Sequence, residues 1–104
     1  VAIAEVGIPA VQQLLALAPD DWRTYDLAGQ MAFEIGAMPE AESHLRQALD
    51  LAPDQAAPHL HLGLVALYRG DAPMAQAHLA RAAELDSEGP IGWQAERLLE
   101  QYFP

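Results

Sequence analysis

Apolar residues recur every three or four positions over most of the chain. The clearest examples are two sets with the i, i+4, i+7 and i+8 spacing that brings side chains onto one face of an α-helix: Leu60, Leu64, Leu67 and Tyr68, and then Ala75, Leu79, Ala82 and Ala83. No segment alternates apolar and polar residues with the period of two typical of a strand. The pattern therefore predicts an all-α fold, with helices at about 9–18, 22–35, 39–51, 56–69, 73–85 and 90–102.

Glycine and proline mark where these helices end and begin. Gly36 and Gly70 stand where a helix ends, and glycine tolerates the left-handed conformation of a helix C-terminus. Pro39 and Pro73 follow three residues later, in the first turn of the next helix, where a missing N–H costs nothing. The short connections predict that successive helices form antiparallel hairpins.

The chain also resembles itself at an offset of 34 residues. The block 11–20 (VQQLLALAPD) matches 45–54 (LRQALDLAPD), and Gly29 recurs as Gly63. So many positions that agree on one offset indicate a 34-residue repeat. One hairpin alone cannot bury its apolar face, whereas stacked hairpins can, so we predict a stack.

The repeat resembles the tetratricopeptide repeat, whose pattern W-x2-L-G-x2-Y-x3-G-x4-A-x3-F-x2-A-x4-P spans 34 residues. In the copy at 22–55 the matching residues are Gly29, Gly36, Ala41, Leu45, Ala48 and Pro53, and in the copy at 56–89 they are Leu62, Gly63, Gly70, Ala75, Leu79 and Ala82. A half-repeat at 8–20 precedes them, and a capping helix at 90–104 follows. The resemblance implies a short right-handed α-solenoid, here a single domain over 1–104 that we expect to be excised from a longer chain.

The same resemblance implies a function. Members of the family bind peptides on a concave face lined by the first helix of each hairpin. That face would be lined or bordered by Arg23, Asp26, Gln30, Phe33, Glu34, Leu60, Leu64, Leu67 and Tyr68. We therefore expect a non-catalytic scaffold or adaptor for a peptide or protein partner. The carboxylate clamp of chaperone adaptors is not expected, because the chain has neither lysine nor asparagine.

A ridge of apolar side chains is the centre of this expected groove. Leu60, Leu64 and Tyr68 lie at successive i+4 positions, and Phe33 is placed to extend the ridge. Three occupants remain open: a partner's apolar side chains, the chain's own last helix through Tyr102 and Phe103, or a second copy. The alternative function is accordingly self-association as a homodimer, through the groove or through an uncapped N-terminal face at 1–11.

Charge narrows the choice of partner. Fifteen acidic residues against five arginines give a net charge of −10, which disfavours nucleic acids and anionic membranes. We expect a basic or apolar partner whose association slows as salt rises.

No apolar run approaches the roughly 20 residues that span a bilayer. No signal segment follows Val1, and a cytoplasmic location is preferred.

Little in the sequence indicates catalysis or metal binding. His59 and His61 point in different directions on one helix, and His44 and His78 occupy equivalent places in two repeats. We expect His59 to pack in place of the repeat's tryptophan, the other histidines to face solvent, and Trp93 to pack within the stack. Without cysteine, a nucleophile elbow or a phosphate loop, we expect no enzyme, no cofactor and no metal.

Overall fold

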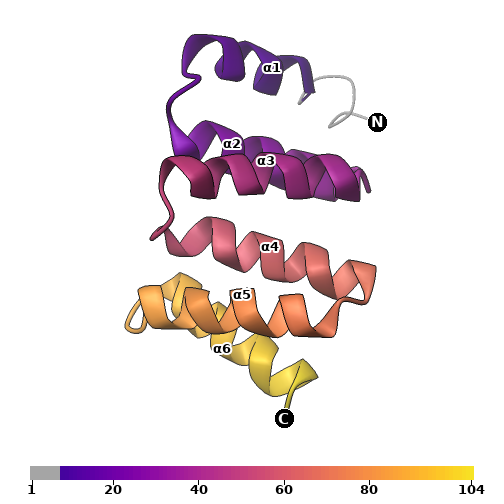
Figure 1. Cartoon of the computed structure of the whole chain (residues 1–104), viewed down its shortest axis with the longest axis vertical. Coiled ribbons are helices and arrows are strands. Elements are labelled where there is room, and N and C mark those ends of the chain that lie inside the picture. The colour runs from indigo at the N-terminus through magenta and orange to yellow at the C-terminus, as the bar shows by residue number, and fades with distance from the viewer. Residues whose placement is uncertain (1–7) are drawn as a thin grey trace. The chain divides into compact units, whose positions relative to one another are not determined.

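The computed structural model describes residues 8–104, with side chains from residue 12 onward, and this part of the chain is all α-helical without a β-strand. Its helices are α1 (Ile8–Leu17), α2 (Trp22–Glu34), α3 (Met38–Leu51), α4 (Ala56–Arg69), α5 (Ala72–Leu85) and α6 (Pro90–Tyr102) (Figure 1). The all-α prediction is confirmed. None of these helices is long and apolar enough to cross a membrane.

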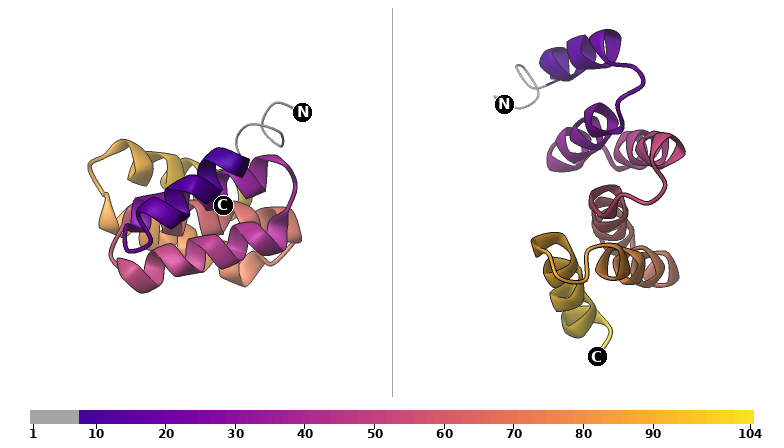
Figure 2. Two further views of the ribbon diagram at one scale, coloured as in Figure 1. Left: turned by 90° about the horizontal axis from the view of Figure 1, so that it is seen from above. Right: turned by 90° about the vertical axis from the view of Figure 1, so that its left-hand side faces the viewer.

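The chain divides into two compact units, residues 1–53 and 54–104. In the first unit α2 packs along α3, and α1 packs against α2. In the second unit α4 packs along α5, and α6 lies against both of them (Figure 2). Each unit therefore contains one helix hairpin and one additional helix.

Each hairpin is held close by a glycine that faces a leucine. A Cβ atom built on Gly63 of α4 would lie 2.7 Å from Cδ2 of Leu79 on α5. In the first unit, Gly29 of α2 faces Leu45 of α3 in the same way, and both leucines are fully buried. A larger residue at either glycine would require the facing leucine or the helices to shift. The absence of a side chain at these two repeat-related positions predicts a close approach of the helices, and the structure confirms it.

The connections within the hairpins follow the predicted turn chemistry. Gly36 and Gly70 have φ angles of 81° and 77°, in the left-handed region that favours glycine. Asp71 then caps α5, because its side chain accepts a hydrogen bond from the backbone N–H of Met74 at 3.2 Å.

The last helix is anchored at its start by Asp86. The Asp86 carboxylate accepts hydrogen bonds from the backbone N–H groups of Ile91 at 3.0 Å and Gly92 at 3.3 Å. A Cβ atom on Gly92 would overlap the Asp86 carbonyl oxygen, so only glycine fits there. This turn fixes the direction in which α6 leaves α5.

The core of the second unit lies where its three helices meet. Leu60 of α4, Leu79 and Ala82 of α5, and Ala95 of α6 form a buried cluster. Partly buried side chains surround it, among them Leu67, Ile91, Leu98, Leu99 and Phe103. The spacing of Ile91, Ala95, Leu98 and Leu99 predicts one apolar face on α6, and their packing against this cluster confirms it. The charged Glu96 and Arg97 are exposed.

Trp93 does not pack within the unit, contrary to expectation. Its side chain is 56% exposed. The packed face of α6 carries Ile91 and Ala95. Trp93 lies two residues from each of them, so its side chain points about 200° away from theirs around the helix axis. The packed face of this helix therefore excludes the tryptophan.

Candidate functional site

An apolar groove runs between α4 and α6 in the second unit. It consists of two adjoining pockets, which we call together the α4–α6 groove. The larger has a volume of about 390 Å³ and is lined by Leu64, Leu67, Tyr68, Leu98 and Tyr102. The smaller, of about 170 Å³, is lined by Leu67, Gly70, Ala72, Tyr102 and Phe103. Because Leu67 and Tyr102 belong to both pockets, the groove is continuous.

The two tyrosines stand at the open side of this groove. Tyr68 is 73% exposed and Tyr102 is 53% exposed, although both have large rings. Leu64, Leu67 and Leu98 behind them are only partly covered. Among the described residues no charged side chain lines the groove. The lining therefore favours apolar side chains of a ligand, and the two tyrosines add aromatic contact area.

The predicted ridge on α4 is divided between core and groove. Leu60 is only 3% exposed, because α6 covers it through the cluster that includes Ala95. Leu60 therefore offers no surface to a ligand, and its assignment to the groove is wrong. Leu64 is half-buried and Tyr68 is open. The chain's own last helix thus buries one end of the ridge, whereas Tyr68 at the other end is exposed.

Arg23, which we expected at the groove, has a local role at the start of α2. Its guanidinium donates to both carboxylate oxygens of Asp21, at 3.1 Å from Nε and 2.9 Å from Nη2. Asp21 also accepts the backbone N–H of Arg23 at 3.0 Å and so caps the helix. These hydrogen bonds from Arg23 lower the pKa of Asp21, and Asp21 raises that of Arg23.

The remaining first-unit residues of the expected groove differ in exposure. Asp26 is only 6% exposed and accepts a hydrogen bond from the side-chain amide of Gln30 at 3.1 Å, so Asp26 is an internal group and not a groove charge. Phe33 is half-buried, and Glu34 is exposed at the end of α2. A groove that combines these side chains with those of α4 stays a prediction, because all residues lining the α4–α6 groove belong to the second unit.

A further pocket lies within the first unit and has no counterpart among the predicted residues. Its volume is about 290 Å³, and it is lined by Gln12, Leu15, Ala28, Met31, Ala32, Ile35, Ala37, Glu40 and His44. Its lining is mostly apolar, and Glu40 and His44 are the titratable side chains that line it. His44 is half-buried here and does not simply face solvent as expected.

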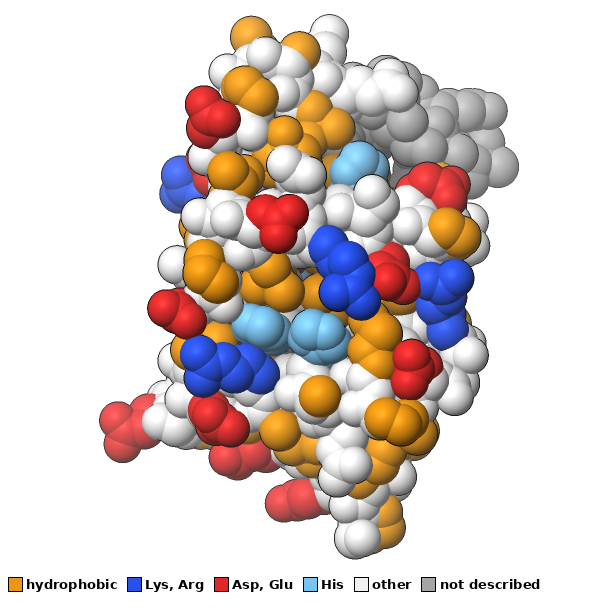
Figure 3. All heavy atoms as spheres, viewed as in Figure 1, with side chains coloured by type: hydrophobic (Ala, Val, Ile, Leu, Met, Phe, Trp, Pro, Cys, Tyr) orange, Lys and Arg blue, Asp and Glu red, His pale blue; other side chains and the backbone are white. Residues whose placement is uncertain are grey.

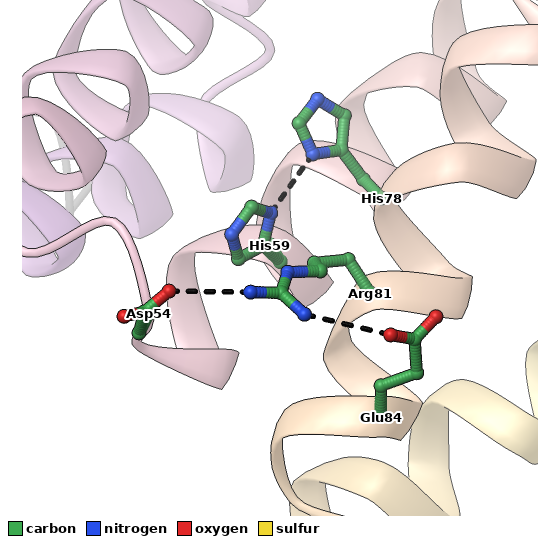
Figure 4. Close-up of polar contacts among 5 residues, drawn as sticks. All are labelled: Asp54, His59, His78, Arg81 and Glu84. Atoms are coloured by element: carbon green, nitrogen blue, oxygen red, sulfur yellow. Dashed lines mark hydrogen bonds and ion pairs between the residues drawn. The ribbon is translucent and has the colours of Figure 1, made fainter.

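Two histidines meet on the surface of the second unit, which the sequence analysis missed. Nδ1 of His59 on α4 lies 3.1 Å from Nδ1 of His78 on α5, and the ring centroids are 5.3 Å apart (Figure 4). His78 is partly buried against His59, so the expectation that it faces solvent is wrong. His59 lies one turn before Gly63, and His78 directly precedes the leucine that Gly63 faces. The register of the hairpin could thus have predicted this pair.

The comparison with protein-family models finds no match, and neither does the comparison with curated proteins. The function must therefore be inferred from the geometry of the chain itself.

Proposed function

We propose that this chain is a non-catalytic binding module whose α4–α6 groove receives apolar side chains of a peptide or protein partner. The observation that carries the proposal is the exposure of Tyr68 and Tyr102 in the lining of a continuous apolar groove. Exposed apolar surface that is contiguous and concave is typical of an interaction site. Tyrosine is enriched among the residues that dominate binding energy at such sites.

The wider architecture that we propose is a short right-handed solenoid of tetratricopeptide type, with repeats at 22–55 and 56–89. The helix starts support it: α2, α4 and α6 begin at residues 22, 56 and 90, and α3 and α5 begin at 38 and 72. Each of these intervals is 34 residues. In such a solenoid α4 and α6 would both be first helices, which line the concave face in this family.

The charge of the chain indicates the chemistry of the partner. The groove has an apolar lining, whereas the chain as a whole carries a net charge of −10. A favourable partner segment would insert apolar side chains into the groove and carry basic residues on either side of them. The basic residues would accelerate association, and added salt would slow it, because long-range attraction is screened.

A selected peptide gives a defined probe for this proposal. Peptides would be selected from a random phage-displayed library against the wild-type chain, and their affinity measured by calorimetry. The double change Leu64→Glu and Tyr68→Ala places a charge in the groove and removes one ring from its edge. We expect it to weaken binding at least tenfold while the helical content remains.

Trp93→Ala is the matched control, because Trp93 is an exposed aromatic residue of the same unit outside the groove. It should leave the affinity unchanged within twofold. Peptides that bind the double variant as tightly as the wild type, or that lose affinity equally in the control, would refute the proposal.

Self-association is a second candidate, favoured by the exposed leucines of α1. Leu14 is 40% exposed and Leu17 is 83% exposed. Residues 1–7 of the predicted N-terminal face lie outside the described residues, and so do the side chains of 8–11. If a second copy covers α1, light scattering will show a dimer that Leu17→Glu converts to a monomer. A wild-type chain that is monomeric at high concentration would rule this candidate out.

A further inference from the structure

The histidine pair of α4 and α5 is unrelated to the α4–α6 groove. His59 and His78 are both partly buried, yet two imidazole rings lie side by side at the surface of the space-filling view, in the part occupied by α4 and α5 (Figure 3). We propose that His59 and His78 bind a divalent transition-metal ion of the kind that prefers imidazole ligands, such as Zn²⁺.

The distance between the two nitrogens suits such an ion. The Nδ1 atoms lie 3.1 Å apart. With zinc–nitrogen bonds of about 2.0–2.1 Å, this separation corresponds to a nitrogen–metal–nitrogen angle of about 100°. That angle lies between the right angle of octahedral coordination and the wider angle of a tetrahedron. An ion bound by both Nδ1 atoms can therefore replace the hydrogen bond between the two rings, with water as the remaining ligands.

The helix hairpin keeps the two rings together. His59 and His78 come from different helices, but these helices approach closely where Gly63 faces the fully buried Leu79. The backbone positions of the two ligands are thus fixed before any ion arrives. A preformed pair loses little conformational entropy on binding, which favours affinity.

The charges around the pair do not repel a cation. Arg81 follows His78 by one turn of α5, and its guanidinium is paired with Asp54 at 3.2 Å and with Glu84 at 3.4 Å (Figure 4). These three side chains together carry a charge of −1. Among the residues that the structure describes, no group of three metal-ligating side chains occurs. We therefore infer an open site with two protein ligands, and not a closed structural zinc site.

Calorimetric titration of the whole chain with ZnCl₂ tests this inference. We expect one Zn²⁺ per chain and at least a tenfold loss of affinity in His78→Gln, whose amide can still hydrogen-bond to His59. His44→Gln is the matched control and should change the affinity less than twofold. Titration with MgCl₂ measures cation binding by the fifteen acidic side chains, which would bind both Mg²⁺ and Zn²⁺. Equal binding of Zn²⁺ by His78→Gln, or no Zn²⁺ binding beyond that of Mg²⁺, would overturn the inference.

A second measurement on the wild-type chain keeps the inference testable if His78→Gln disturbs folding. Imidazole resonances in nuclear magnetic resonance spectra report directly which rings bind the ion. Zn²⁺ should shift the resonances of His59 and His78 together, at one ion per chain, and leave those of His44 in place. Shifts that leave either ring of the pair unchanged would overturn the inference.

Discussion

Replacement of Leu60 by alanine tests how the ridge on α4 is divided between core and groove. Leu60 is 3% exposed and lies in a cluster formed by all three helices of the second unit. Truncation of such a leucine loses its transfer free energy and leaves a cavity, at a total cost of about 2–5 kcal/mol. Because three helices meet around this side chain, collapse into the cavity is restricted, and we expect about 3 kcal/mol.

Tyr68→Ala is the matched comparison, eight residues further along the same helix. Tyr68 is 73% exposed, so its truncation should change the free energy of unfolding by no more than about 0.5 kcal/mol. The expected difference between the two variants is thus more than 2 kcal/mol, or upwards of about 10 °C in the melting temperature of a domain of this size.

The assay is urea unfolding followed by tryptophan fluorescence in a Trp22→Phe background. Trp93 is then the only tryptophan, and it belongs to the second unit, so the signal reports the unit that contains the mutation. Circular dichroism checks that helical content is retained. If Leu60→Ala costs less than about 1 kcal/mol, or if Tyr68→Ala costs as much as Leu60→Ala, the division of the ridge is wrong.

Three other changes test the local geometry. Gly63→Ala should destabilise the second unit by about 1–3 kcal/mol in urea unfolding, because the new Cβ would lie 2.7 Å from Leu79. Asp86→Ala removes the acceptor for two backbone amides at the start of α6, and should cost about 0.5–2 kcal/mol by the same assay. Arg23 lowers the pKa of Asp21 below its ordinary value of 3.8. The stabilising effect of the Asp21 carboxylate is therefore fully present above that value and is lost as the pH falls through the lowered pKa. Asp21→Asn keeps a capping side chain but cannot titrate there, so its acid unfolding curve should be less steep than that of the wild type.

The helices themselves were predictable because their signals are local. Gly36 and Gly70 end helices through a backbone preference that no distant residue alters, and Pro39 and Pro73 restrict where the next helix begins. The close approach at Gly63 was also expected, because a glycine within a helix lets a neighbouring helix pack close to its backbone. These features depend on one residue and its neighbours along the chain.

The exposure of individual side chains was less predictable because it depends on the crossing of α6. The position of α6 buries Leu60 and exposes Trp93, although both were assigned from repeat positions that assume an average geometry. That position is set by Asp86 and Gly92, whose fit is visible only in three dimensions. The groove lining from α6, notably Leu98, was missed for the same reason.

The histidine pair was not predicted from the sequence. The spacing of histidines within one helix, or between equivalent positions of two repeats, does not indicate contacts across a hairpin. His59 and His78 are 19 residues apart and meet across the hairpin. The same holds for Arg81, which reaches back to Asp54 over 27 residues. Contacts across a hairpin require its register, which Gly63 and Leu79 together define.

The most direct test of the account is to map a bound peptide onto the chain. A peptide selected from a displayed library would be titrated into isotope-labelled protein, and methyl and aromatic resonances would be followed by nuclear magnetic resonance. The account predicts the largest shifts at the groove residues Leu64, Leu67, Tyr68, Leu98 and Tyr102, with smaller ones at buried Leu60. Shifts concentrated on α1 or on the exposed face of α5, with the groove tyrosines unchanged, would contradict it.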